Sequence, residues 1–269
     1  MTYLTVQKQL DMALFLRLSL VALFLFSALD ILAVPTRIMV RAKARDAKFI
    51  GTSMGGAYIR ITDSMTGKLL SDGYTTGGTG STDIIMRQAH ARNGRLTNDE
   101  TAGYLATLDI EDPVFITISV LGPVNGPRDQ VLASTQIWAI PGKHIEGDGI
   151  ILEIPGMVVS VLEPQMTHSV TFGQTAFVPL KAHVIMMCGC PISEGGMWDS
   201  NDVEVKAMVY QDGDLKLVVP LVWKETNIFE GRLPASSVGQ YEVMIYAYNA
   251  QTGNTGLDKV NIIVSPANP

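Results

Sequence analysis

The sequence predicts an all-β protein made of two β-sandwich domains in tandem, behind an N-terminal signal segment. Short runs rich in Val, Ile, Thr and aromatic residues alternate apolar with polar positions, as strands with one buried face do. Turn residues separate these runs, and the 25 glycines and 13 prolines are spread along the whole chain. A length of 269 residues exceeds that of a usual single domain and favours two.

Composition excludes two classes of protein. With 47% hydrophobic and 17% charged residues, the chain can fill sizeable cores and is not of the disordered class. A formal net charge of −6 argues against a nucleic-acid partner, since proteins that bind nucleic acid normally carry a basic patch.

Residues 1–33 are predicted to be a signal peptide. The run 12–32 is almost continuously apolar, and Arg17 lies in a short basic region if translation starts at Met12. Residues 18–29 then form the apolar core, and cleavage follows Ala33. We therefore expect a periplasmic or extracellular protein. The alternative is an uncleaved anchor, in which this segment is the chain's one contact with the membrane; Arg17 and Asp30 inside the run weigh against it.

Residues 34–158 are predicted to form the first β domain. A strand at 57–61 leads into a turn that contains Thr66-Gly67, and a Gly/Thr-rich connection at 72–83 follows a second short strand. Further strands are expected at 104–108, 114–121 and 131–140. The pattern of 57–61, Thr66-Gly67, Leu69-Leu70, Gly73 and 75–78 is similar to carboxypeptidase-regulatory or transthyretin-like domains. That resemblance implies a scaffold or binding module without catalytic residues.

Residues 159–269 are predicted to form the second β domain. Segments 176–188 and 203–210 alternate cleanly, and strands are also expected at 215–223, 240–248 and 258–264. The stretch 239–247 followed by 253–256 resembles the last two strands of bacterial immunoglobulin-like domains. The resemblance gives Tyr241 the role of a corner tyrosine, whose hydroxyl ties back to the preceding connection. Gly253-Asn254 would form the turn of the final hairpin. The chain departs from the pattern in having no inter-sheet cysteine pair.

The chain's two cysteines lie together in Cys188-Gly189-Cys190, followed by Pro191. In an extended strand their Cα atoms would be roughly 6.6 Å apart, near the upper limit for a disulfide. A bridge therefore requires a bend at Gly189, which both Gly and the following Pro favour. Three interpretations stay open: a structural disulfide, a Cu(I) site and a redox pair.

A copper site would use soft ligands around the two thiolates. Met187 is adjacent, and the turn at 194–196 brings Met197 back toward the corner. His183 is a weaker candidate, because four residues of strand place it about 13 Å from Met187. These residues are the predicted metal ligands if Cu(I) is the cofactor.

No motif for catalysis supports an enzyme. The sequence has no nucleophile elbow, no zinc-protease helix and no phosphate-binding loop. We expect a non-enzymatic exported protein that binds a protein partner as an accessory subunit of an extracytoplasmic assembly. The alternative is a periplasmic copper carrier or sensor that uses the Cys-Gly-Cys corner.

Overall fold

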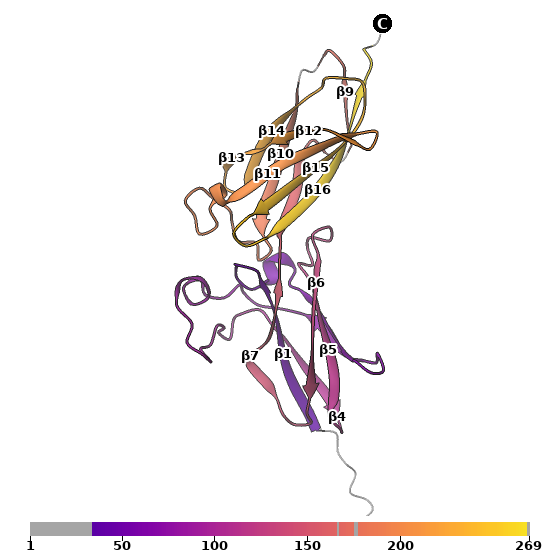
Figure 1. Ribbon diagram of the computed structural model, residues 1–269. Coiled ribbons are helices and arrows are strands. Elements are labelled where there is room, and N and C mark those ends of the chain that lie inside the picture. Colours follow the sequence, from indigo (N-terminus) through magenta and orange to yellow (C-terminus); the bar gives the residue numbers. More distant parts are fainter. Residues whose placement is uncertain (1–33, 166, 175–176, 268–269) are drawn as a thin grey trace, which may run out of the picture.

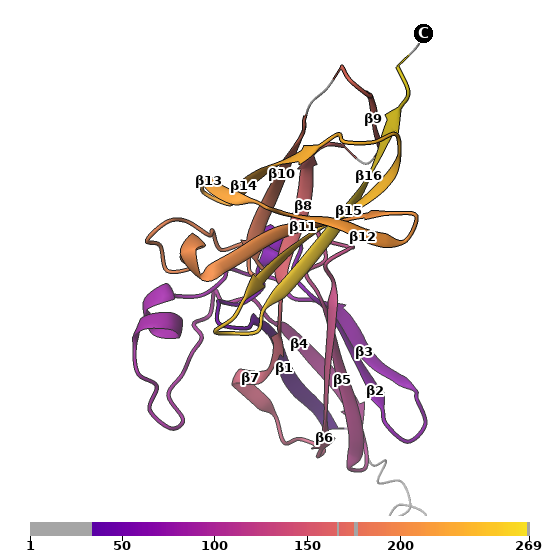
Figure 2. The same ribbon diagram turned by 45° about the horizontal axis from the view of Figure 1, so that its top comes forward.

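The predicted fold class is confirmed, because the chain forms two β-sandwiches in tandem. A computed structural model describes residues 34–165, 167–174 and 177–267, and their regular structure is almost entirely strand. We call residues 34–154 the first sandwich and residues 157–265 the second sandwich. Figure 1 shows them stacked end to end along one long axis, and Figure 2 shows the same stack tilted. Among the described residues no helix is long and apolar enough to cross a membrane, and the predicted signal peptide lies outside them.

The first sandwich contains a three-stranded and a four-stranded sheet. The three-stranded sheet has the order β4-β1-β7, in which β1 runs antiparallel to β4 and parallel to β7. The other sheet has the order β3-β2-β5-β6 and is antiparallel throughout. The strands are β1 (Val34–Ala44), β2 (Tyr58–Asp63), β3 (Leu69–Tyr74), β4 (Tyr104–Ile110), β5 (Val114–Gly122), β6 (Val131–Ala139) and β7 (Ile145–Ile154).

Alternation along the strands builds the first core. On β5, Ile116, Ile118 and Val120 are fully buried, whereas the residues between them are half-exposed. The predicted turn after β2 contains Gly67 with a φ of 73°, a conformation that Gly adopts without a steric penalty. Two short helical turns, η1 (Thr52–Met54) and η2 (Asp83–Arg87), lie in the connections between strands.

The second sandwich contains a four-stranded and a five-stranded sheet. Their orders are β13-β14-β10-β8 and β12-β11-β15-β16-β9, and β9 joins β16 in parallel. This division of the strands is immunoglobulin-like. The strands are β8 (Met157–Glu163), β9 (Thr167–Thr171), β10 (Phe177–Met186), β11 (Val203–Gln211), β12 (Asp214–Pro220), β13 (Val222–Glu225), β14 (Ile228–Pro234), β15 (Gly239–Asn249) and β16 (Thr255–Ser265), with the helical turn η3 (Ser200–Asp202) before β11.

Only Pro155 and Gly156 separate β7 from β8. Gly156 has a φ of 121°, where a side chain would be strained, and this bend ends β7. Since β8 already pairs with β10, the predicted division between residues 158 and 159 falls inside a strand of the second sandwich. One continuous cluster of buried apolar side chains extends through both sandwiches and across the linker.

Candidate functional site

The Cys-Gly-Cys corner is a tight reversal at the end of β10. The Gly189 N–H donates to the carbonyl of Met186 (2.7 Å), and the Met186 N–H donates to the carbonyl of Cys190 (3.2 Å). Gly189 has a φ of 78°, so the chain bends at the residue where a disulfide between Cys188 and Cys190 needs a bend. Cys188 and Cys190 form a disulfide, with their Cα atoms 5.4 Å apart.

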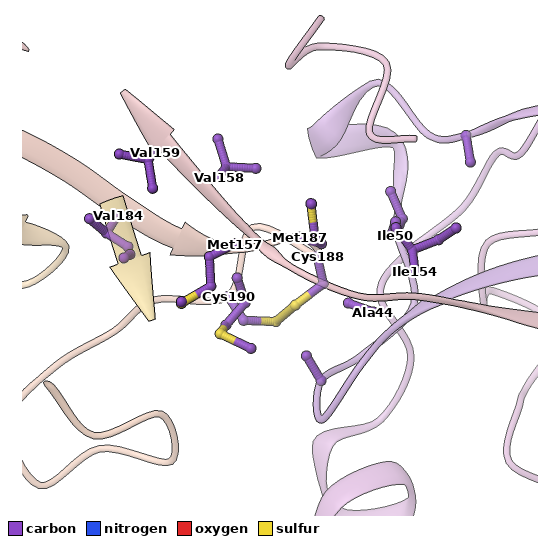
Figure 3. Close-up of a cluster of buried hydrophobic side chains, with 14 of the residues drawn as sticks. Ala44, Ile50, Ile154, Met157, Val158, Val159, Val184, Met187, Cys188 and Cys190 are labelled. Carbon is purple, nitrogen blue, oxygen red and sulfur yellow. A yellow bond between two sulfur atoms is a disulfide. The ribbon is translucent and has the colours of Figure 1, made fainter. Parts of the chain in front are cut away.

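The disulfide is buried between the two sandwiches. Cys188 is 1% exposed and Cys190 is 5% exposed. Figure 3 shows the S–S bond with Met157 and Val184 of the second sandwich on one side and Ile50 and other residues of the first sandwich on the opposite side. The corner is therefore part of the packing that joins the sandwiches.

Two close approaches fix the corner against its surroundings. A Cβ atom on Gly189 would lie 2.9 Å from Sδ of Met54, which belongs to η1 of the first sandwich. A Cβ atom on the linker residue Gly156 would lie 2.7 Å from Cε of Met187. Real Cβ contacts are longer, so a side chain at either position would have to displace a methionine, and the positive φ of both residues also favours glycine. Met54 of the first sandwich and Gly156 of the linker thus pack against the corner.

Backbone and side-chain hydrogen bonds join the sandwiches next to the corner. Asn254, fully buried, accepts from the N–H of Gly156 (2.8 Å) and donates to the carbonyl of Arg45 (3.1 Å). The indole N–H of Trp198 donates to the carbonyl of Asp46 (2.8 Å). The predicted turn residue Asn254, in the β15–β16 connection with Gly253, therefore also satisfies two backbone groups at the junction.

An ion pair joins the sandwiches at a second place. Arg128, in the connection between β5 and β6, pairs with Asp258 of β16 (2.7 Å), and Asp258 also accepts from the N–H of Val161 (2.9 Å). The neighbouring Asp129 accepts from the N–H of Val159 (3.2 Å). Burial raises the pKa of the Asp129 carboxyl; the Val159 hydrogen bond opposes this shift and the charge of Asp258 adds to it.

The predicted metal ligands do not all lie together. Met187 is buried at the corner, whereas Met197 is 41% exposed and lines a small concavity with Met186 and Trp198. His183 lies within β10, between partners on β8 and β14, and burial lowers its pKa. Within the described part of the chain, no three His, Cys, Asp or Glu side chains converge as a metal site. In the disulfide form neither sulfur is a thiolate, so Cu(I) binding stays a prediction for the reduced protein.

Three methionines next to the corner were not predicted as its neighbours from the sequence. Met54 contacts Gly189, Met157 lies beside the disulfide in Figure 3, and Met186 accepts and donates the hydrogen bonds of the turn. Met186 is adjacent in sequence and could have been included. Met54 is a single methionine in a glycine-rich loop 134 positions away, and no local pattern connects it with the corner. The redox interpretation requires an accessible sulfur, and both cysteines are nearly inaccessible.

The apolar surface on the outer side of the five-stranded sheet was also not predicted from the sequence. This sheet face is lined by Met208, Met244, Tyr246, Tyr248 and Leu257, with Met208 paired opposite Met244 and Tyr246 opposite Leu257. Two open concavities of about 780 and 510 Å³ lie on it. Alternation in a single strand predicts which residues point outward, but it does not predict which outward residues of different strands become neighbours.

Four charged side chains on the sheet face form two ion pairs. Lys206 binds Glu204 (2.6 Å) and Lys259 binds Glu242 (3.3 Å). The Tyr246 hydroxyl donates to Glu204 (2.7 Å), and this hydrogen bond raises the pKa of Tyr246 to about 12. The face is therefore apolar in its centre and carries no net charge from these four groups.

Tyr241 has the contacts that the immunoglobulin resemblance implies. Its hydroxyl donates to the carbonyl of Ser237 (2.8 Å), which ties β15 to the connection before it. The ring is 7% exposed and packs in the second core. This residue is structural and takes no part in the junction.

No protein-family model matches the sequence, and no curated protein sequence is similar to it. Among solved structures, the chain is similar to the fibronectin(III)-like modules of Clostridium thermocellum CbhA, with 14% identity, 78% of each chain covered and a TM-score of 0.29. It is also similar to the N-terminal four Ig domains of Dscam1 isoform 4.44, with 11% identity, 86% of this chain and 53% of that chain covered, and a TM-score of 0.19. Both TM-scores are low, so the fold assignment rests on the strand order.

Proposed function

We propose that this chain is a non-enzymatic exported protein that binds a protein partner as an accessory subunit of an extracytoplasmic assembly. The observation that carries the proposal is the sheet face of the second sandwich, where Met208, Met244 and Tyr246 line open concavities. These three side chains are half-buried, and methionine and tyrosine are enriched where proteins bind proteins, because they offer adaptable or rigid apolar contact area.

The chemistry of the sheet face defines the partner. Four of its charged groups already pair within the chain, so a charged partner would gain no new ion pair from them and would lose solvation. The partner surface is therefore apolar and uncharged at its centre. The junction supports this role because it holds the second sandwich at one position relative to the first.

Export is supported by the corner. Disulfides persist in oxidising compartments, so the bond between Cys188 and Cys190 favours an exported protein. Together with the basic-then-apolar order of residues 12–33, this supports a periplasmic or extracellular location. Mass spectrometry of the protein from its natural producer tests the step: we expect a mature N-terminus near residue 34, and an intact N-terminus in the membrane fraction would favour the anchor.

Photo-crosslinking in the natural producer tests the binding function. A benzophenone amino acid replaces Met244 or, as control, Lys224 on β13 of the opposite sheet. We expect one exported protein to crosslink at position 244 and not at 224, and Met208→Glu to abolish the product. Met65→Glu, on an exposed turn of the first sandwich, should leave it unchanged. Crosslinking no stronger at 244 than at 224 would overturn the proposal.

Copper binding is the second candidate, and the sulfur-rich surroundings of the corner favour it. Reduction would yield two thiols, which lose their protons on metal binding, in a corner that contains Met187 and packs against Met54 at Gly189; this is a soft ligand set suited to Cu(I). The test is a Cu(I) titration of reduced protein against a competing chelator. If copper binds, the Cys188→Ser/Cys190→Ser variant loses the binding. Weaker binding by Met54→Leu would indicate the ligands buried at the corner, and weaker binding by Met197→Leu would indicate the ligands predicted from the sequence. Equal, negligible binding by wild type and the double variant would eliminate this candidate.

A further inference from the structure

Strand β6 is an unprotected sheet edge. It pairs only with β5 in the described sheet, and its other edge is unpaired. Its nine residues, VLASTQIWA, contain no charged residue and no proline. Leu132 is 66% exposed and Trp138 is 58% exposed. Soluble proteins normally protect such edges with charges, proline or a very short strand, because an open edge pairs with other chains.

The other edge strands of this protein carry the usual protection. Each of β3, β4, β7, β8, β12 and β13 contains at least one Asp, Glu, Lys or Arg, and β9 is only five residues long. Within the described sheets, β6 is thus the one long edge without charge. This contrast within one molecule indicates that the β6 edge has a partner.

The sequence of β6 is self-complementary when two copies run antiparallel about Thr135. Leu132 then faces Trp138 of the second copy, Ala133 faces Ile137, and Ser134 faces Gln136. Apolar side chains meet apolar ones and polar meet polar at each position, and cross-strand pairs of this kind stabilise a sheet. A two-fold axis through Thr135 gives both copies the same contacts, as closed homodimers require.

The neighbouring strand in the same sheet also lacks charge. The neighbouring strand β5, with the sequence VFITISVLG, has none, and its Phe115 ring lies against Trp138 with centroids 5.2 Å apart. Gln136 is held by Thr117 of β5 (2.9 Å). A charged strand would lose solvation here without gaining an ion pair, whereas β6 of a second copy brings no charge. Charge complementarity therefore favours the copy over a charged partner.

The overall shape leaves room for this pairing. Figures 1 and 2 show β6 along the side of the first sandwich, with the second sandwich beyond one end. An antiparallel pair of copies places the two second sandwiches at opposite ends of the dimer. We propose that β6 pairs with β6 of a second copy, in antiparallel register about Thr135, and joins the two four-stranded sheets into one.

This dimer is independent of the partner-binding function proposed above, and purified protein suffices to test it. A strand pair of nine residues lies at the low end of specific interfaces, below roughly 1,200 Å², so the dimer dissociates on dilution. Sedimentation equilibrium of the full chain should show a monomer–dimer equilibrium at about 100 µM. Thr135→Lys places two positive charges opposite each other at the axis, so it should weaken dimerisation at least about tenfold.

Disulfide trapping tests the register. Residues paired across the two-fold axis have Cα atoms about 4.5–5.5 Å apart, within reach of a disulfide. Thr135→Cys should therefore give a covalent dimer under mild oxidation, whereas Leu69→Cys, on the opposite edge strand β3, should not. A mixture of Leu132→Cys and Trp138→Cys should crosslink better than either variant alone. Circular dichroism checks that each variant is folded.

The outcomes separate cleanly. A dimer that Thr135→Lys weakens and Thr135→Cys traps supports the proposal. A chain that stays monomeric at about 100 µM and gives no more crosslink at 135 than at 69 overturns it. A dimer that tolerates Thr135→Lys uses another surface and also overturns it.

Discussion

At the scale of single residues, Gly189 links the chemistry of the corner to the packing of the junction. Its positive φ makes the turn that brings the two cysteines together, and its missing side chain leaves space for Met54. A side chain at this position meets two separate penalties, one in the backbone and one in the contact. Gly195 has a φ of 63° with no atom within 4 Å of an added Cβ, so it meets the backbone penalty alone.

We therefore expect Gly189→Ala to lower the free energy of unfolding by more than Gly195→Ala. Backbone strain applies to both variants, whereas the clash with Met54 adds about 1–3 kcal/mol to the first. Denaturant unfolding of the two variants and wild type measures the difference. Equal losses would show that Met54 moves aside at no cost and that the close approach is not a constraint.

Asp129 gives the junction a pH dependence. Burial raises the pKa of its carboxyl, so the folded chain binds the proton more tightly than the unfolded chain does. The contribution of protonated Asp129 to stability is complete below the unfolded pKa and is lost as the pH rises through the folded pKa. Asp129→Asn keeps an acceptor for the Val159 N–H without the charge. We expect this variant to be more stable than wild type at about pH 7 and equal to it at about pH 3.

Asp63 supplies a control of opposite sign. Hydrogen bonds from the N–H groups of Met65 and Thr66 lower its pKa, so its contribution is present above the unfolded pKa and lost as the pH falls through the folded pKa. Asp63→Asn should therefore be less stable than wild type at neutral pH. Urea midpoints across the pH range measure both variants, and a shift of the same sign in both would contradict the assignment for Asp129.

At the scale of elements, the sequence predicts strands better than it predicts their neighbours. The alternation in β10 places Val178, Leu180 and Ala182 in the core, and all three are buried. β6 has the composition of a strand, but it lies at a sheet edge, and most of its residues are exposed. Local pattern does not distinguish a central strand from an edge strand, because that difference depends on which other strands pair with it.

The β15–β16 connection contributes more to the free energy of unfolding than its turn sequence predicts. Asn254→Ala should leave the buried N–H of Gly156 and the part-buried carbonyl of Arg45 without their partner. Each such group costs about 1–3 kcal/mol, so we expect a large loss in the free energy of unfolding. Asn261→Ala, an exposed position on β16, should change it by no more than about 0.5 kcal/mol. Equal effects in denaturant unfolding would mean that water replaces Asn254 at the junction.

At the scale of the whole molecule, contacts between distant segments are what the sequence does not reveal. The glycine and proline around the cysteines indicate a bend, and the bend is present. That the bend packs on Met54 depends on how two sandwiches stack, and no periodicity within either one encodes this. The same holds for Arg128 and Asp258, two charged residues 130 positions apart that become an ion pair only at the junction.

The continuous core predicts that the two sandwiches unfold together. Buried side chains cross the junction without a break, and only two residues link β7 to β8, so wild type should unfold in a single transition. Met54→Asp places a carboxylate against the buried corner, where it has no partner, and should separate the transition into two. Met65→Asp makes the same change at a side chain that is 84% exposed and should leave one transition. Calorimetry measures this through the ratio of van't Hoff to calorimetric enthalpy, which should fall below one for Met54→Asp alone. Two transitions in wild type, or equal behaviour of the two variants, would show that the sandwiches fold independently.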